Sequence, residues 1–148
     1  MKHIAKFSAK KEKHGNKFPF ILDFDYSEIS TRLGVIFSDD TLSTVHIPHL
    51  LSKSQAEFDQ GAMNELVFAL PEPMQYVFFI QMLNKWLTVS DTGMNLYLFD
   101  MERIRSQPEK VMSKLNTNTN ELRVRMVLEV VPLSCICITA GNEVNFYN

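Results

Sequence analysis

Cysteine is scarce in this chain, and its placement argues against a disulfide-stabilised scaffold. The 148 residues include only two cysteines. Cys135 and Cys137 stand two apart in an apolar run that predicts a strand, where two thiols on one face are poorly placed to bond to each other. We therefore expect two free, buried thiols, which is typical of a protein from a reducing compartment.

Glycine is also scarce, and this limits the chemistry that the chain can support. The five glycines are widely spaced, so no glycine-rich phosphate-binding loop is present. No Gly-x-Ser-x-Gly sequence is present either, and both cysteines lie where a thiolate is disfavoured. These absences favour a non-catalytic protein without a cofactor.

Long apolar runs are missing as well. Residues 1–6 are interrupted by Lys2 and Lys6 and do not resemble a secretory signal. The longest apolar runs, such as 76–80, are far too short to cross a bilayer. We expect a cytoplasmic protein with no membrane segment.

The composition that remains is that of one globular domain. Hydrophobic residues make up 45% of the chain and charged residues 22%. A chain of this length fits a single domain, and the sequence shows no internal repeat and no domain boundary. We therefore treat residues 1–148 as one unit.

The charges are sorted by position. Residues 1–17 carry six lysines against one glutamate, whereas residues 18–102 carry twelve carboxylates against three cationic side chains. The net charge of −2 hides this asymmetry. Such sorting indicates electrostatic docking, either onto a partner or between copies of the chain.

The N-terminal segment 1–26 predicts a β-hairpin with a basic tip at 10–17. The polar tip contains a Gly-Asn turn signal between two strand-like runs. In the second run, 18–26, the aromatic and leucine side chains alternate with Asp23 and Asp25. This alternation predicts an apolar core face and a solvated face that carries both carboxylates.

Six further segments are typical of strands, and one is ambiguous. The strand-like segments are 32–37, 42–47, 94–99, 122–131, 133–139 and 144–147. Residues 65–70 are apolar and fit either a strand or a helix.

The sequence also predicts helices. The principal one spans about 73–88, because Val77, Ile80, Leu83 and Leu87 share a helical face and Pro73 suits a first turn. Shorter helices are expected at 53–60, behind a capping box, and within 102–115, interrupted at Pro108. Together these patterns predict an α+β fold: a mostly antiparallel sheet with one principal amphipathic helix and two or three short ones.

The preferred functional hypothesis is a non-catalytic protein-interaction module that self-associates as a homo-oligomer. Its basic tip would dock on an acidic surface of a protein partner or of a second copy. A second hypothesis is nucleic-acid binding, in which the same tip grips phosphates together with two arginines of a C-terminal strand. The binding residues of these hypotheses are Lys10, Lys11, Lys13, His14, Lys17, Arg123 and Arg125.

A third hypothesis is a metal-dependent hydrolase. Asp23 and Asp25 share a strand face, and His46 and His49 stand three apart. Carboxylates can hold Mg²⁺, and imidazoles are common zinc ligands. Pro48 argues against a helix that would bring the two histidines together, and no spacing points to a third ligand. We therefore expect a solvated carboxylate face and no metal site.

Overall fold

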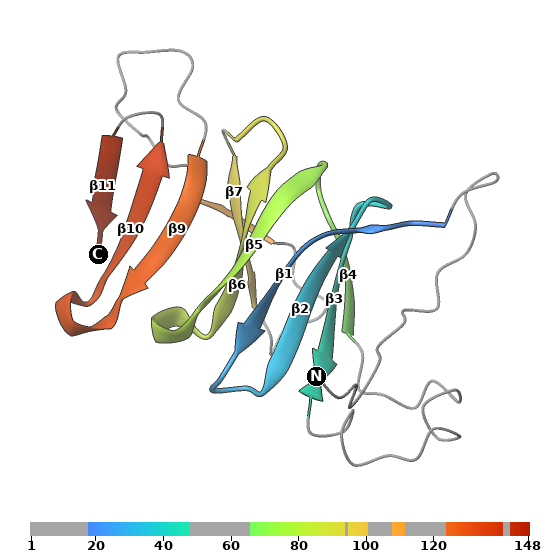
Figure 1. Cartoon of the computed structure of the whole chain (residues 1–148), viewed down its shortest axis with the longest axis horizontal. Coiled ribbons are helices and arrows are strands. Elements are labelled where there is room, and N and C mark those ends of the chain that lie inside the picture. The colour runs from blue at the N-terminus through green and yellow to red at the C-terminus, as the bar shows by residue number, and fades with distance from the viewer. Residues whose placement is uncertain (1–17, 48–65, 94, 101–107, 112–123, 141–142) are drawn as a thin grey trace, which may run out of the picture.

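The computed structural model describes residues 18–47, 66–93, 95–100, 108–111, 124–140 and 143–148 (Figure 1). These residues form three antiparallel sheets, in each of which neighbouring strands are consecutive in the chain. The first sheet contains β1 (Ile21–Ser27), β2 (Arg32–Phe37), β3 (Thr41–His46) and β4 (Leu66–Ala69). The second contains β5 (Met74–Ile80), β6 (Lys85–Ser90), β7 (Leu96–Asp100) and β8 (Glu109–Val111). The third contains β9 (Val124–Val130), β10 (Cys135–Ala140) and β11 (Glu143–Tyr147).

The three sheets share one backbone feature. The turn between the first and second strand of each sheet ends in a residue with positive φ: Thr31 at 52°, Asn84 at 50° and Ser134 at 49°. In the second and third sheets this residue follows a three-residue 3-10 turn, η1 (Gln81–Leu83) or η2 (Val131–Leu133). The left-handed conformation reverses the chain so that the next residue begins the second strand. The three sheets are therefore structural repeats, although their side chains show no sequence repeat.

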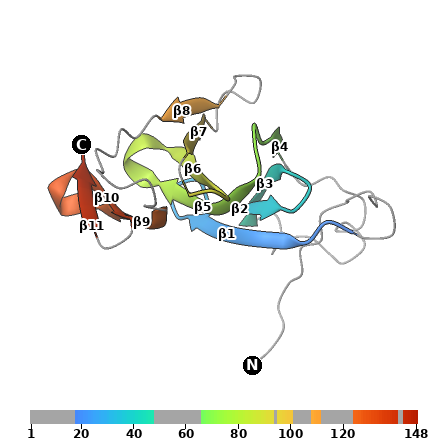
Figure 2. The same ribbon diagram turned by 90° about the horizontal axis from the view of Figure 1, so that it is seen from above.

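The core lies between the sheets in two clusters. One cluster joins the first and second sheets and includes Ile36, Phe79 and Trp86. The other joins the second and third sheets and includes Leu87 and Ile138. The second sheet is thus covered on both faces, and Figure 2 shows the sheets fanning out from their first strands.

Trp86 of the second sheet packs closely against Gly34 of the first sheet. Trp86 is fully buried and packs edge-on against Phe79, with 4.9 Å between ring centroids. A Cβ atom on Gly34 would lie 2.6 Å from Cζ3 of Trp86, which is nearer than atoms can approach. Glycine is therefore required on β2 because the indole ring rests directly on its backbone.

The predicted principal helix at 73–88 is wrong, and so is the α+β fold class. Residues 74–80 form β5, and residues 85–90 form β6, with η1 between them. Val77 faces the first sheet while Phe78 faces the third, so both faces of β5 are apolar. A strand covered on both faces loses its polar alternation and can imitate a helical stripe. The helical elements with described bounds are the three-residue turns η1 and η2.

The other predicted elements divide into three groups. Residues 32–37 form β2 at the predicted bounds, and the other strand predictions that fall on described residues hold within three residues at each end, whereas the first strand of the predicted hairpin lies outside the described residues. The ambiguous segment 65–70 is a strand, β4, and residues 109–111 form β8 where a helix was expected. The basic tip 10–17 and the predicted helix 53–60 lie outside the described residues.

Candidate functional site

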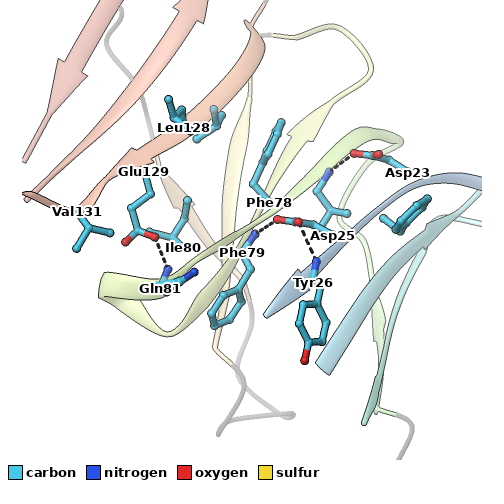
Figure 3. Close-up of a pocket in the computed structure, with 13 residues that line it drawn as sticks. Asp23, Asp25, Tyr26, Phe78, Phe79, Ile80, Gln81, Leu128, Glu129 and Val131 are labelled. Carbon is cyan, nitrogen blue, oxygen red and sulfur yellow. Dashed lines mark hydrogen bonds between the residues drawn. The ribbon is translucent and has the colours of Figure 1, made fainter. Parts of the chain in front are cut away.

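The first strands of the three sheets lie side by side and border a pocket. β1, β5 and β9 run in the same direction (Figure 1). The pocket between them measures about 420 Å³ and is lined by residues 23–26, 77–81, 127–129 and 131. Figure 3 shows that its walls combine aromatic and aliphatic side chains with three carboxylates, those of Asp23, Asp25 and Glu129.

Two of these carboxylates bind the free edge of β5. The backbone N–H groups of Val77 and Phe79 point away from β6, toward β1. Val77 donates to Oδ2 of Asp23 at 3.0 Å, and Phe79 donates to Oδ2 of Asp25 at 2.8 Å. The spacing matches because alternate residues of two extended strands are separated by the same distance. The aspartates thus replace the neighbouring strand that an open sheet edge would otherwise recruit.

The third carboxylate joins the second and third sheets in a similar way. Glu129 of β9 accepts the N–H of Gln81 through Oε2 at 2.9 Å and that of Met82 through Oε1 at 2.6 Å. These are the first two N–H groups of η1, which have no partner within the turn itself. A single carboxylate therefore satisfies both donors and connects the two sheets (Figure 3).

This arrangement corrects the expected role of the Asp23 and Asp25 face. The sequence predicted that the two carboxylates are solvated and that the aromatic residues of the same strand form the core. The structure shows the reverse, because Phe24 is 66% exposed while Asp23 and Asp25 are half-buried between the sheets. The register explains this: Asp23 lies opposite Ile36, which faces the second sheet, and Phe24 lies opposite Val35 on the other face.

The residues of the hydrolase hypothesis are not brought together. His46 lies at the end of β3, two strands away from β1, and its Nε2 is 2.7 Å from the hydroxyl of Thr31. His49 lies outside the described residues. Within the described ranges, no three histidine, cysteine or acidic side chains form a group able to hold a metal ion. Asp23 and Asp25 instead accept backbone N–H groups of β5, a structural role that the hydrolase hypothesis did not include.

Of the predicted binding residues, Arg125 alone can be placed. It lies exposed on β9. Lys10, Lys11, Lys13, His14, Lys17 and Arg123 lie outside the described residues. The structure therefore neither assembles this basic set nor separates it. Cys135 and Cys137 are free and buried, as predicted.

Apolar side chains are exposed on the outer face of the third sheet. We call this surface the β9–β11 end face; its exposed side chains are Met126 and Leu128 of β9 and Val144 and Phe146 of β11, and the buried Cys137 of β10 lies between Leu128 and Phe146. Leu128, Cys137 and Phe146 form one row across the three strands. Leu128 is 56% exposed and Phe146 is 63% exposed. Contiguous exposed apolar side chains of this kind are typical of interaction surfaces.

A second apolar surface lies on the opposite end of the stack. We call it the β1 end face; it consists of Leu22, Phe24 and Tyr26 on the side of β1 that faces away from the second sheet. All three are at least 43% exposed. Val35 and Val45, on the same side of the first sheet, are already buried. The exposed part of this face is therefore the strip along β1.

Sequence reasoning found the apolar alternation of β1 but missed the β9–β11 end face. The sequence did contain a signal for this face, since Met126 and Leu128 alternate with Val127 and Glu129 and therefore share one side of the strand. What the sequence lacked was the register that aligns Leu128, Cys137 and Phe146 across three strands. Glu129 was missed because its partners lie almost fifty residues away in the chain.

Comparison with known proteins shows the fold and no family. No family model and no curated protein matches the chain. Two solved structures of Kluyveromyces lactis Hsv2 are similar, one of them with loop 6CD replaced by a Gly-Ser linker. Both align with a TM-score of 0.56 and 11% identity over 88% of this chain. The chain spans 36% of one of these proteins and 33% of the other, about a third of their length.

The fold therefore defines a class. Successive four-stranded antiparallel meanders, stacked face to face with their first strands together, are the blades of a β-propeller. The positive-φ residues recur after 53 and then 50 residues, a period typical of propeller blades. The described residues form three sheets of this type, two with four strands and the third with three. Among the described residues, no helix is long and apolar enough to cross a membrane.

Proposed function

We infer that the chain is a non-catalytic protein-interaction module that binds through its apolar end faces. The observation that carries this is the continuous apolar row of the β9–β11 end face, with Phe146 63% exposed. Within a repeat stack each sheet buries its apolar faces against its neighbours. The two outer faces of this stack have the same character as the inner ones, and exposed aromatic side chains are the usual anchors of protein interfaces.

The basic segment 10–17 adds an electrostatic component to this proposal. Its lysines would attract acidic surfaces, and residues 18–102 of the chain itself are strongly acidic. Such attraction raises the rate of encounter more than the final affinity. Apolar contact would then hold the complex that the charges bring together. In this proposal the protein acts in the cytoplasm and binds its partner without a cofactor.

The carboxylates of the pocket support a scaffold function better than a catalytic one. Asp23, Asp25 and Glu129 each accept backbone N–H groups of the second sheet. A catalytic acid or base must instead reach a proton of the substrate. The site thus holds the sheets in register and leaves binding to the end faces.

A substitution at the end face tests the proposal. We expect Phe146→Asp to raise the dissociation constant of self-association at least about tenfold, because it places a charge within an apolar contact. Light scattering after size exclusion over a range of protein concentrations gives this constant. Ile29→Asp is the matched control, since Ile29 is also 63% exposed but lies in the turn after β1.

Two results would count against the proposal. One is a chain that remains a monomer at every concentration. The other is equal weakening by Phe146→Asp and Ile29→Asp, which would show that the end face has no special part. Binding of an oligonucleotide that weakens steeply with added salt would instead favour the nucleic-acid hypothesis.

A further inference from the structure

Equivalent positions in the three sheets can be counted from the positive-φ residues Thr31, Asn84 and Ser134. Three places after each lie Gly34, Leu87 and Cys137. Gly34 contacts Trp86 of the second sheet, and Leu87 belongs to the cluster shared with the third sheet. This position therefore faces the following sheet each time. Cys137, on the β9–β11 end face, has no following sheet in the described chain.

The first strands obey the same rule. Phe78 and Leu128 each lie six places before the positive-φ residue, and Phe78 packs in the cluster that contains Val127 of the next sheet. Val127 in turn is equivalent to Phe24 of the first sheet. By this equivalence, Leu128 would pack against a residue at the position of Phe24, as Phe78 packs near Val127. The β9–β11 end face and the exposed strip along β1 thus occupy positions equivalent to the two sides of the interface that the three sheets already form twice.

Propellers close when the last sheet packs against the first, and typically contain about 4–8 sheets. The described residues form three sheets, which is fewer than this range. Two copies supply six, which lies within that range, whereas three copies would supply nine. A contact between two different faces closes into a ring when its rotation allows closure.

We propose that two copies of the chain close into a six-sheet ring, with the β9–β11 end face of each copy packed on the β1 end face of the other. This inference rests on the proposed function and names its partner as a second copy. Met126 and Leu128 of one copy lie on Phe24 and Tyr26 of the other. The contact is between different faces, and it occurs twice because the copies are related by a two-fold axis.

Mixing two variants tests this geometry. Phe24→Lys alters the β1 end face, and Leu128→Asp alters the β9–β11 end face; both side chains are exposed, so folding is retained. Each variant alone damages both interfaces of the ring, and we expect each to be a monomer where the unmodified chain is a dimer. In an equimolar mixture, one interface is unmodified and the other joins opposite charges. The mixture is expected to regain a mass of twice the 17.1 kDa chain.

Other outcomes would overturn the ring. A contact between identical faces predicts that one variant stays a dimer, that the other is a monomer, and that mixing restores nothing. An open head-to-tail array predicts that the mass of the unmodified chain keeps rising with concentration beyond two copies. Both outcomes retain self-association, so they defeat the ring but not the proposed function. A chain that is a monomer at all concentrations defeats both. Urea unfolding of each variant confirms that it is folded before mixing.

Discussion

A few single residues position the sheets relative to one another. Gly34 allows the indole of Trp86 to rest on β2, and Asp23, Asp25 and Glu129 each join two sheets through backbone N–H groups. The carboxylates follow a common logic. Each replaces a missing hydrogen-bonding partner at an edge or a turn, where an unsatisfied buried donor would be costly.

Replacing Gly34 by alanine tests the contact with Trp86. The added Cβ would lie 2.6 Å from the ring, so the second sheet must shift. We expect a loss of about 1–3 kcal/mol in the free energy of unfolding, measured with urea. In a Trp86→Leu background the same substitution should cost clearly less, because the ring is gone. Equal costs in the two backgrounds would assign the role of Gly34 to something else.

Asp25 offers a test of the carboxylate contacts. Asp25→Ala leaves the N–H of Phe79 without its acceptor and should lower the free energy of unfolding by about 1–3 kcal/mol. Asp25→Asn keeps an acceptor oxygen and should cost less. Urea unfolding compares the two. If asparagine and alanine were equally destabilising, the negative charge and not the hydrogen bond would be the important property.

At the scale of elements, the linker between the first and second sheets is held by a polar contact. Glu72 accepts a hydrogen bond from Nδ2 of Asn95 at 2.8 Å and one from the hydroxyl of Tyr97 at 2.6 Å. The hydrogen bond to Glu72, together with burial and the negative charge, raises the pKa of Tyr97 above its usual value. The protonated phenol is therefore favoured in the folded state, and the contact ties β7 to the linker.

This contact predicts a dependence of stability on alkaline pH. The phenol of the unfolded chain ionises near pH 10, and that of the folded chain ionises higher. The contribution is complete below pH 10 and is lost as the pH rises through the folded pKa. Tyr97→Phe should therefore flatten the fall in unfolding free energy as the pH rises above about 10. Tyr147→Phe is the comparison, because burial raises the pKa of Tyr147 without a hydrogen bond to Glu72. An unchanged slope for Tyr97→Phe would contradict the prediction.

Strands could be predicted wherever one face is polar or a turn is marked. Arg32–Phe37 was recovered at its bounds because Ser38, Asp39 and Asp40 end it clearly. The region 74–90 was predicted as a helix because β5 and β6 are buried on both faces, so they lack the alternation of a half-exposed strand, and a helical spacing of apolar residues arose by chance. The site was predicted in part. Asp23 and Asp25 were noticed, but the sequence alone does not contain the register that turns them toward β5.

At the scale of the whole molecule, the proposed function assigns the sorted charges and the apolar end faces to different steps of association. The charges act at a distance and before contact, whereas the end faces act only after contact. The near-neutral total charge of −2 gives no indication of either. Both become visible only when the chain is divided by position and by sheet.

Charge reversal in the basic segment separates the two steps. Replacing Lys10, Lys11 and Lys13 by glutamate should slow association about tenfold or more at low salt and leave a flatter salt dependence. The dissociation rate should change much less, because the end faces are unaltered. Association followed by stopped-flow light scattering at low and high salt measures both rates. An unchanged association rate would exclude the segment from docking.

The order of strands also has a consequence for biosynthesis. Every strand in the described sheets pairs with its neighbours in sequence, so each sheet is complete as soon as its own last strand has been made. The first sheet can form on the ribosome before the second is translated, and repeat stacks grow in this stepwise manner. The backbone of Gly34 remains uncovered until Trp86 emerges, more than fifty residues later. The nascent chain thus gains its first two-sided core only when translation has passed the middle of the second sheet.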